Sequence, residues 1–331
     1  MVRALVWEKP ADYEAGDLDQ DGLWKKVIGE LFEDFLLFFA PTLHAQVDFS
    51  KAPDFLQQEL FQEIMDEKKG RRMADQLVKV YLVDGEEKWI LVHVEVQSDN
   101  EKDFAKRMFQ YFYRIYDRFD REIVALAIMT SPHQSEFSTQ FRYSYFGTKL
   151  DYAYTNYKVA DYDYKELEQS DKLFSKVVLA TKYMNETKQD ADKRYAFKMK
   201  LMREIIKHPI YSRTTIQAVF YFIDYLLRLP QELSEQLAKI IRPILKEEAN
   251  DMVQFNEENP SPTLAAIFAM EREEGERKGI EQGIERGIEQ GIEQGIAKVV
   301  LEMLKEGASI DFIAKVTHLD KEAIEKIRKM N

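Results

Sequence analysis

Apolar residues recur along the chain in two different periods, which predict strands in one part and helices in the rest. Between residues 76 and 97 they alternate or run together, as in strands, and Asp84-Gly85 is a strong turn signal between two such runs. The run from Ile123 to Met129 has no alternation, which is typical of a strand buried on both faces. Residues 152–159 predict a further, aromatic-rich strand.

Helical spacing precedes and follows these strands. The segment from Leu23 to Leu36 carries an apolar stripe and is followed by Pro41, and the segment from Asp103 to Phe119 is amphipathic. A strand hairpin, a helix and a further strand, with helices on both sides, indicate an α/β fold with a mixed sheet flanked by helices. From about residue 166 to residue 250 the pattern is wholly helical, which predicts an all-helical C-terminal region.

The segment from residue 271 to residue 296 is an internal repeat. Glycine stands at 275, 279, 283, 287, 291 and 295, and isoleucine at 280, 284, 288, 292 and 296. Because four residues exceed the ~3.6 of one helical turn, the glycine line winds slowly around a helix. Each interior glycine costs a helix roughly 1 kcal/mol relative to alanine, so this helix would be marginal in isolation. Two interpretations stay open: helices that pair across the glycine line into a homo-oligomer, which we favour, or a flexible helical linker.

The last block of the sequence predicts two short helices. Ser309 can cap the first, Thr317-His318-Leu319 can form the turn, and Asp320 can cap the second. Such a pair resembles the small helix-turn-helix of many bacterial DNA-binding proteins, and it is as often a packing clip. Both interpretations stay open for this block.

Polar residues near the open end of the predicted hairpin form the main candidate site. Asp75 precedes the first strand. On the second strand His93, Glu95 and Gln97 alternate with valines and therefore share one face. A tight turn makes paired residue numbers sum to about 171, which sets Asp75 opposite Val96. A slip of one residue in either direction would set it opposite Glu95 or Gln97.

Two converging carboxylates offer the oxygen ligands that a hard divalent cation prefers. The same residues also occur on ordinary solvated strand faces, so spacing alone leaves a surface strand as the alternative. The strand around Glu95 is strongly apolar, however, and polar groups gathered inside such a strand need a partner. A metal ion or a basic side chain can be that partner.

Basic residues near the acidic pair predict contacts to phosphate groups. The net charge of -12 counts against nucleic-acid binding by the chain as a whole, because lysine and arginine contacts normally supply most non-specific affinity. A local basic strip can serve instead. Arg72 lies just before Asp75. Arg107, Tyr111 and Arg114 follow at i, i+4 and i+7 of a helix, near enough to line a common surface.

Four motifs carry a resemblance to a known family. They are Leu23-Trp24-Lys25, Arg71-Arg72-Met73-Ala74-Asp75, Val94-Glu95-Val96-Gln97-Ser98 and Arg107-Met108-Phe109-Gln110-Tyr111. From about Asp21 to Pro132 the chain resembles the Rpn family of recombination-promoting nucleases and transposases, a branch of the PD-(D/E)XK nuclease superfamily. A weaker match extends to the glycine-rich tail. The resemblance implies a metal-dependent DNA endonuclease linked to recombination or mobile elements, with Mg²⁺ (or Mn²⁺) as cofactor and DNA as partner.

The motifs match the family residue by residue. Asp75 matches its first acidic metal ligand and Glu95 its second, and the Val96 carbonyl is a further candidate ligand. Gln97 stands where the superfamily usually has lysine, so it can orient water or phosphate without supplying positive charge. His93 is an auxiliary candidate because it shares the face of Glu95. The alternative is a catalytically degenerate nuclease fold that acts as a DNA-binding, protein-interaction or assembly module.

With this interpretation the chain divides into four parts. Residues 1–165 form the PD-(D/E)XK nuclease-like core, 166–265 a helical region, 266–298 the repeat tether and 299–331 the helix-turn-helix-like hairpin. There is no cysteine, which excludes disulfides, thiolate catalysis and cysteine-ligated zinc. The longest apolar run, Phe35-Leu36-Leu37-Phe38-Phe39-Ala40, is far too short to span a bilayer. We therefore expect a soluble cytoplasmic protein without a membrane partner.

Overall fold

The computed structural model describes residues 20–56, 75–95, 101–132, 138–208, 210–248 and 260–329, and of residues 21, 75, 91–95, 101–103, 247 and 248 it describes the backbone alone. The chain forms two compact units, Met1–Ile267 and Phe268–Asn331. The described strands are β1 (Asp54–Phe55), β2 (Asp75–Tyr81), β3 (Glu87–Glu95), β4 (Ile123–Met129), β5 (Gln140–Tyr145), β6 (Thr148–Ala153) and β7 (Thr155–Lys158).

The described helices of the first unit are α1 (Gln20–Glu30), α2 (Phe32–Phe39), α3 (Pro41–His44), α5 (Glu101–Phe119), the 3-10 turn η1 (Val159–Asp161), α6 (Tyr164–Gln169), α7 (Phe174–Glu186), α8 (Ala191–Ile206), α9 (Arg213–Leu226) and α10 (Gln231–Glu248). Helix α11 (Pro262–Lys305) begins in the first unit. The second unit also contains α12 (Ile310–Thr317) and α13 (Lys321–Lys329).

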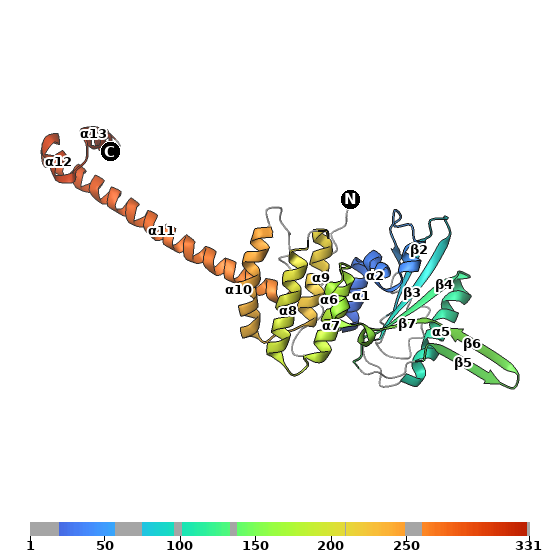
Figure 1. Cartoon of the computed structure of the whole chain (residues 1–331). Coiled ribbons are helices and arrows are strands. Elements are labelled where there is room, and N and C mark those ends of the chain that lie inside the picture. Colours follow the sequence, from blue (N-terminus) through green and yellow to red (C-terminus); the bar gives the residue numbers. More distant parts are fainter. Residues whose placement is uncertain are drawn as a thin grey trace. The chain divides into compact units, whose positions relative to one another are not determined.

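A five-stranded mixed sheet has the strand order β1-β2-β3-β4-β7 (Figure 1). β1, β2 and β3 are antiparallel neighbours, whereas β3, β4 and β7 are parallel neighbours. Helix α5 makes the crossover from β3 to β4 that parallel neighbours require. From α6 onward the described elements are all helical. The prediction of a mixed α/β fold followed by an all-helical region is confirmed.

Different helices cover the two faces of the sheet. The Gln76 Nε2 atom donates to the Lys25 carbonyl of α1 at 2.8 Å. The next residue, Leu77, packs with Trp89 against Ile115 of α5. Because neighbouring residues of a strand point to opposite faces, α1 lies on one face and α5 on the other.

Helices α1 and α2 also join the sheet to the helical region. Trp24 makes an edge contact with Phe222 of α9, with ring centroids 5.7 Å apart, and Phe35 contacts Phe174 of α7 at 5.5 Å. The sequence predicted a single helix here, and this is wrong, because the chain bends at the buried Leu31 between α1 and α2. The bend lets the apolar residues of both short helices reach the same core.

Helix α1 ends on an acidic residue with a shifted pKa. Burial raises the pKa of Glu30 from its ordinary value of 4.5 to about 7, and the charge of nearby Lys26 opposes this shift only in part. The folded chain therefore holds a proton at Glu30 that the unfolded chain releases between these two pH values. Its stability falls as the pH rises through this window.

Glu30→Gln tests this effect. Near pH 8 we expect the free energy of unfolding of the variant to exceed that of the wild type by about 1–2 kcal/mol. This value allows for the partial exposure of Glu30. Near pH 4 both folded and unfolded wild-type chains hold the proton, so the difference should vanish. Urea unfolding at the two pH values measures it. A difference that does not change with pH would contradict the shifted pKa.

In the second unit α12 and α13 pack against the end of α11. Val300, Ile313 and Ile324 form a small buried core. Ser309 and Asp320 accept backbone N–H bonds at the starts of the two short helices, as the sequence predicted. The prediction of two short helices is confirmed, and both helices pack on the end of α11.

The glycine repeat lies within the continuous helix α11. Its isoleucines at 280, 284, 288 and 292 are exposed. A Cβ atom built on any of its six glycines would meet nothing within 4 Å apart from the helix's own backbone. Among the helices that the structure describes, none is both long and apolar enough to cross a bilayer.

Candidate functional site

Strands β2 and β3 form the predicted hairpin, but with a different register. Asp75 pairs with His93, and the predicted pairing with Val96 is wrong. Directly opposed residues share a face, as do residues two apart on one strand, so Asp75, His93 and Glu95 occupy one face of the sheet. Asp75 and Glu95 are diagonal neighbours in this register. In diagonal pairs the two Cβ atoms lie about 7 Å apart. The two acidic positions therefore come together through another pairing than the sequence predicted.

The loop between the strands explains the difference. The sequence predicted that the first strand continues to Val83 and ends in a tight turn. Instead Leu82 bridges Val47, and the Val83 amide donates to the Gln46 carbonyl at 2.9 Å. Within the hairpin the Leu82 amide donates to the Glu86 carbonyl at 2.7 Å, and the Gly85 amide donates to the Leu82 carbonyl at 2.9 Å. Residues 83–85 therefore form a three-residue loop that ends on Gly85, with φ of 92°. The turn signal at Asp84-Gly85 was therefore right, but it did not distinguish a two-residue turn from a three-residue loop.

Helix α5 covers this face and brings an arginine level with the acidic pair. Trp89 lies on the same face as Glu95 and contacts Phe119 of α5, with ring centroids 4.5 Å apart. Because β4 is parallel to β3, α5 runs back antiparallel to β3. From this contact Glu95 lies about 20 Å along the strand and Arg107 about 18 Å along the helix. Arg107 is therefore at the level of Glu95.

The three residues predicted to share a surface on α5, Arg107, Tyr111 and Arg114, are all half-buried. The Arg107 guanidinium lies 5.6 Å from the ring centroid of Phe104, a cation–π distance. Tyr111 packs against the cluster that contains Leu77. Tyr111 thus contributes to the packing of α5 on the sheet, whereas the two arginines are the candidate phosphate contacts on this helix.

Three predicted site residues, Arg72, Val96 and Gln97, lie outside the residues that the structure describes. Among the side chains that it does describe, no group of three or more acidic or histidine residues could hold a metal ion. No family model, no curated protein and no solved structure matches the chain. The register of β2 and β3 and the packing of α5 therefore define the candidate site.

The sequence patterns did not single out a group of exposed aromatic residues on the same helix. Tyr113 and Tyr116 of α5 are exposed, whereas Phe109 and Phe112 beside them are partly buried. The two tyrosines lie off the apolar stripe of the helix. Large aromatic residues at positions where an amphipathic helix normally carries charge are the signal that would have found them.

Proposed function

We propose that this chain is a Mg²⁺-dependent DNA endonuclease of the recombination-promoting type. The proposal is supported by one observation above all, the register in which Asp75 and Glu95 share a face of the sheet. An arginine at the level of Glu95, on the helix that covers this face, suits a phosphate beside a cation. The reaction is hydrolysis of a phosphodiester bond in DNA.

In this proposal Asp75 and Glu95 hold the cation, with the Val96 carbonyl as a further ligand. Carboxylate and carbonyl oxygens are the donors that Mg²⁺ or Mn²⁺ prefers. Such an ion, when bound, supplies Lewis acidity and lowers the pKa of water. His93 is directly opposite Asp75 in the register and is the auxiliary residue of the proposed site.

The phosphates of DNA are bound by the basic residues around this centre. Arg107 and Arg114 contribute from α5, and Arg72 from the segment before β2. A guanidinium group can donate two parallel hydrogen bonds to one phosphate, which fixes its orientation as well as its position. Gln97 orients the attacking water or the phosphate through its amide.

Gln97 also favours a second candidate function. A lysine at this place would stabilise negative charge on the transition state, and a glutamine supplies no such charge. A chain that keeps the fold and the arginines without this charge can bind DNA and leave it uncut. The alternative is therefore a degenerate nuclease fold that acts as a DNA-binding or interaction module.

Incubation of the full chain with supercoiled plasmid distinguishes the two functions. For the endonuclease we expect nicked or linear plasmid with Mg²⁺ or Mn²⁺ and intact plasmid when EDTA is added. Retarded migration of intact plasmid with both metals would favour the binding module. A plasmid that is neither cut nor retarded would contradict both DNA functions.

We further propose that the repeat of α11 pairs with the same helix of a second copy. Its glycines allow two helix backbones to approach closely, and its exposed isoleucines gain from burial against the partner. The glycines also make the isolated helix less stable by roughly 1 kcal/mol each. Pairing can offset this cost and would explain why the repeat contains glycines.

Substitution of Gly283 and Gly287 by alanine separates helix stability from pairing. We expect more helix by circular dichroism, because alanine is the better helix former, together with loss of the oligomer, because the two methyl groups block close approach. Light scattering measures the mass. Gln282→Ala with Gln290→Ala is the matched control and should keep the oligomer. A wild type that has the mass of one chain would contradict pairing.

A further inference from the structure

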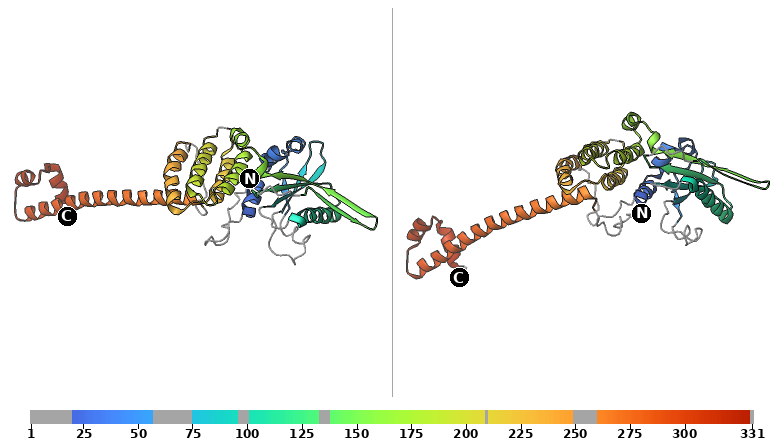
Figure 2. Two further views of the ribbon diagram at one scale, coloured as in Figure 1. Left: turned by 60° about the horizontal axis from the view of Figure 1, so that its bottom comes forward. Right: turned by 90° about the horizontal axis from the view of Figure 1, so that it is seen from below.

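The hairpin of β5 and β6 is separate from the five-stranded sheet and projects from the first unit in all views (Figures 1 and 2). Its strands pair along their full length, and Phe146-Gly147 forms a two-residue turn. One face carries its large apolar side chains other than that of Phe146: Phe141, Tyr143, Tyr145, Leu150 and Tyr152. This face is aromatic from the base of the hairpin to its tip.

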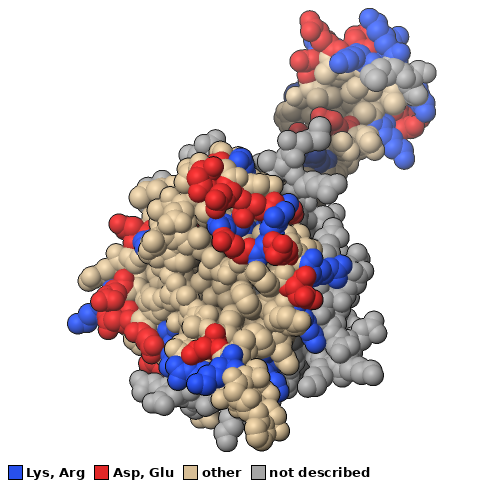
Figure 3. All heavy atoms as spheres, turned by 90° about the vertical axis from the view of Figure 1, so that its right-hand side faces the viewer, with Lys and Arg blue, Asp and Glu red and all other residues tan. Residues whose placement is uncertain are grey.

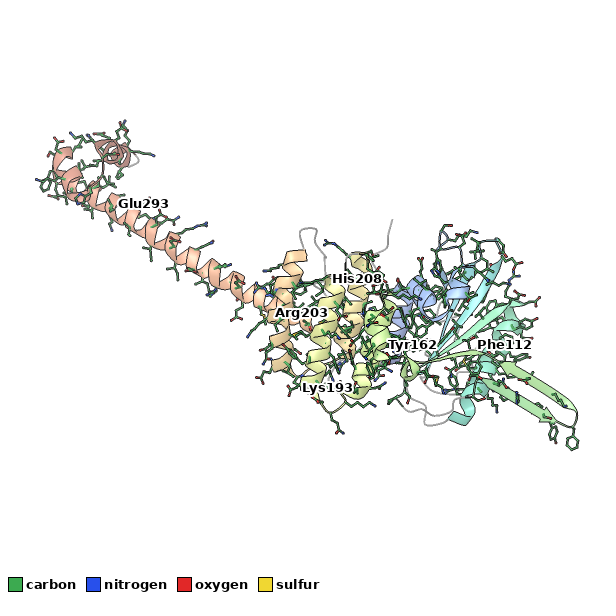
Figure 4. The ribbon with its side chains drawn as sticks, in the orientation of Figure 1. Phe112, Tyr162, Lys193, Arg203, His208 and Glu293 are labelled. Atoms are coloured by element: carbon green, nitrogen blue, oxygen red, sulfur yellow. The ribbon has the colours of Figure 1, made fainter. Side chains whose placement is uncertain are left out.

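Helix α5 holds the base of the hairpin. Phe141 stacks on Phe109 with ring centroids 5.1 Å apart. Tyr152 contacts Phe112, which is labelled in Figure 4, at 4.9 Å. Tyr152 is also buried. Packed aromatic rings therefore hold the base of the hairpin in place, and the tip extends from this base.

The tip is apolar, exposed and conformationally unfavourable. Phe146 is 93% exposed with φ of 41°, and Gly147 after it has φ of 88°. Two-residue turns of this kind favour asparagine or aspartate before glycine, because a bulky residue is disfavoured at positive φ. Tyr145 beside it is 62% exposed. Burial within the described chain does not account for a phenylalanine here, which points to an external partner.

Two exposed tyrosines of α5 extend this surface. Tyr113 stacks beside Phe109 at 6.2 Å, and Tyr116 stacks beside Phe112 at 5.9 Å. Phe109 and Phe112 are the same residues that hold the base of the hairpin. We call the exposed rings together the aromatic surface: Tyr113, Tyr116, Tyr143, Tyr145 and Phe146. Its α5 rings lie on buried or half-buried neighbours, so little side-chain entropy remains to be lost on binding.

The helix that carries these tyrosines is basic in an acidic protein. Helix α5 contains five lysines or arginines and three acidic residues, whereas the whole chain has a net charge of -12. Lys106, Arg118 and Arg121 are exposed. Figure 3 faces the side to which the hairpin points, and near its lower edge basic side chains gather beside an uncharged projection. Flat rings next to cations suit a nucleic-acid strand, because bases stack on rings and phosphates pair with cations.

We propose that the aromatic surface binds single-stranded DNA by stacking unpaired bases on its rings, with the basic side chains of residues 106–121 along the phosphates. The identity of the strand as DNA rests on the proposed function. The substrate class that follows is DNA with unpaired bases. Duplex DNA covers the faces of its bases and cannot stack in this way. A bilayer would suit the tip but would not explain Tyr113 and Tyr116 among basic residues at the base of the hairpin.

The test is the affinity of the full chain for a fluorescent oligothymidine, measured by anisotropy in EDTA so that no cleavage occurs. Phe146→Asn and Tyr145→Ala should each weaken binding roughly five- to 100-fold, at low and high salt alike. Val83→Ala, at the exposed turn of the other hairpin, is the matched control and should bind as the wild type does. Phe146→Asn should unfold at the same or a higher temperature, because asparagine suits its φ, so its weaker binding cannot come from unfolding.

A wild type that does not bind the oligonucleotide, or variants that bind it as tightly as the wild type, would overturn the inference. So would binding to phosphatidylserine vesicles that Phe146→Asn abolishes while oligonucleotide binding is unchanged. Plasmid cleavage is scored separately. A chain that binds the oligonucleotide through Phe146 but cuts no plasmid contradicts the endonuclease and supports the aromatic surface. A chain that cuts plasmid but does not bind the oligonucleotide supports the endonuclease and contradicts the aromatic surface as a binding site.

Discussion

Replacement of Asp224 by alanine is expected to lower the free energy of unfolding by about 3–5 kcal/mol. Asp224 of α9 and Lys198 of α8 are both fully buried, and the Lys198 Nζ atom lies 2.5 Å from Asp224 Oδ1. Thr263, at the start of α11, donates to the same carboxylate through its amide at 2.8 Å and its hydroxyl at 2.6 Å. Alanine would leave a buried ammonium group without its counter-ion and two donors without their acceptor.

The pH dependence of this variant follows from the pKa of Lys198. Burial lowers this pKa and the charge of Asp224 opposes the shift, so removal of Asp224 lowers the pKa further. A lysine whose pKa is lower in the folded than in the unfolded chain releases its proton first in the folded state. Stability then rises with pH in this window. Asp224→Ala should therefore regain part of its lost stability in alkaline solution.

Urea unfolding of Lys198→Met, of Asp224→Leu and of the double variant with both changes tests whether the lost free energy of unfolding comes from the buried pair. The double variant removes both charges and keeps the volume, so it should be more stable than Asp224→Ala. A loss below about 1 kcal/mol in Asp224→Ala, or a double variant whose loss equals the sum of the single losses, would contradict a coupled buried pair.

The sheet could be predicted where each strand carries its own signal. The β2–β3 hairpin, the amphipathic helix α5 and the buried strand β4 all lie where the apolar pattern predicted them. The register of the hairpin was predicted wrongly, because Asp84-Gly85 fits both a two-residue turn and the three-residue loop that forms, which the Leu82 amide closes by donating to the Glu86 carbonyl. Local pattern thus predicted the strands, and the length of the loop between them set their alignment.

The candidate site, like the sheet, was predicted only in part. The shared face of His93 and Glu95 follows from strand alternation alone, but the addition of Asp75 to it depends on the register. The β5–β6 hairpin was missed, and residues 152–159, predicted as one strand, are divided between β6 and β7. Phe146-Gly147 lacks the asparagine or aspartate that normally signals such a turn, so its residue choice concealed the hairpin.

Neutral, isosteric substitution of the acidic pair should have the second large effect. Asp75→Asn and Glu95→Gln keep the size of each side chain and remove a negative charge that the cation needs. We expect each to slow plasmid cleavage about a thousandfold, equivalent to roughly 4 kcal/mol of transition-state stabilisation. Asp84→Asn is the matched control on the same hairpin. Its side chain accepts the Glu86 amide at 2.9 Å in the exposed loop, a bond that asparagine can also accept.

Whether Asp75 and Glu95 form one metal site is decided by the rate at which these four proteins cut plasmid with Mg²⁺. We expect the wild type and Asp84→Asn to cut at the same rate, and Asp75→Asn and Glu95→Gln to be slower by similar factors. A wild type that does not cut with Mg²⁺ or Mn²⁺, or variants of Asp75 and Glu95 that cut as fast as the wild type, would contradict the metal site.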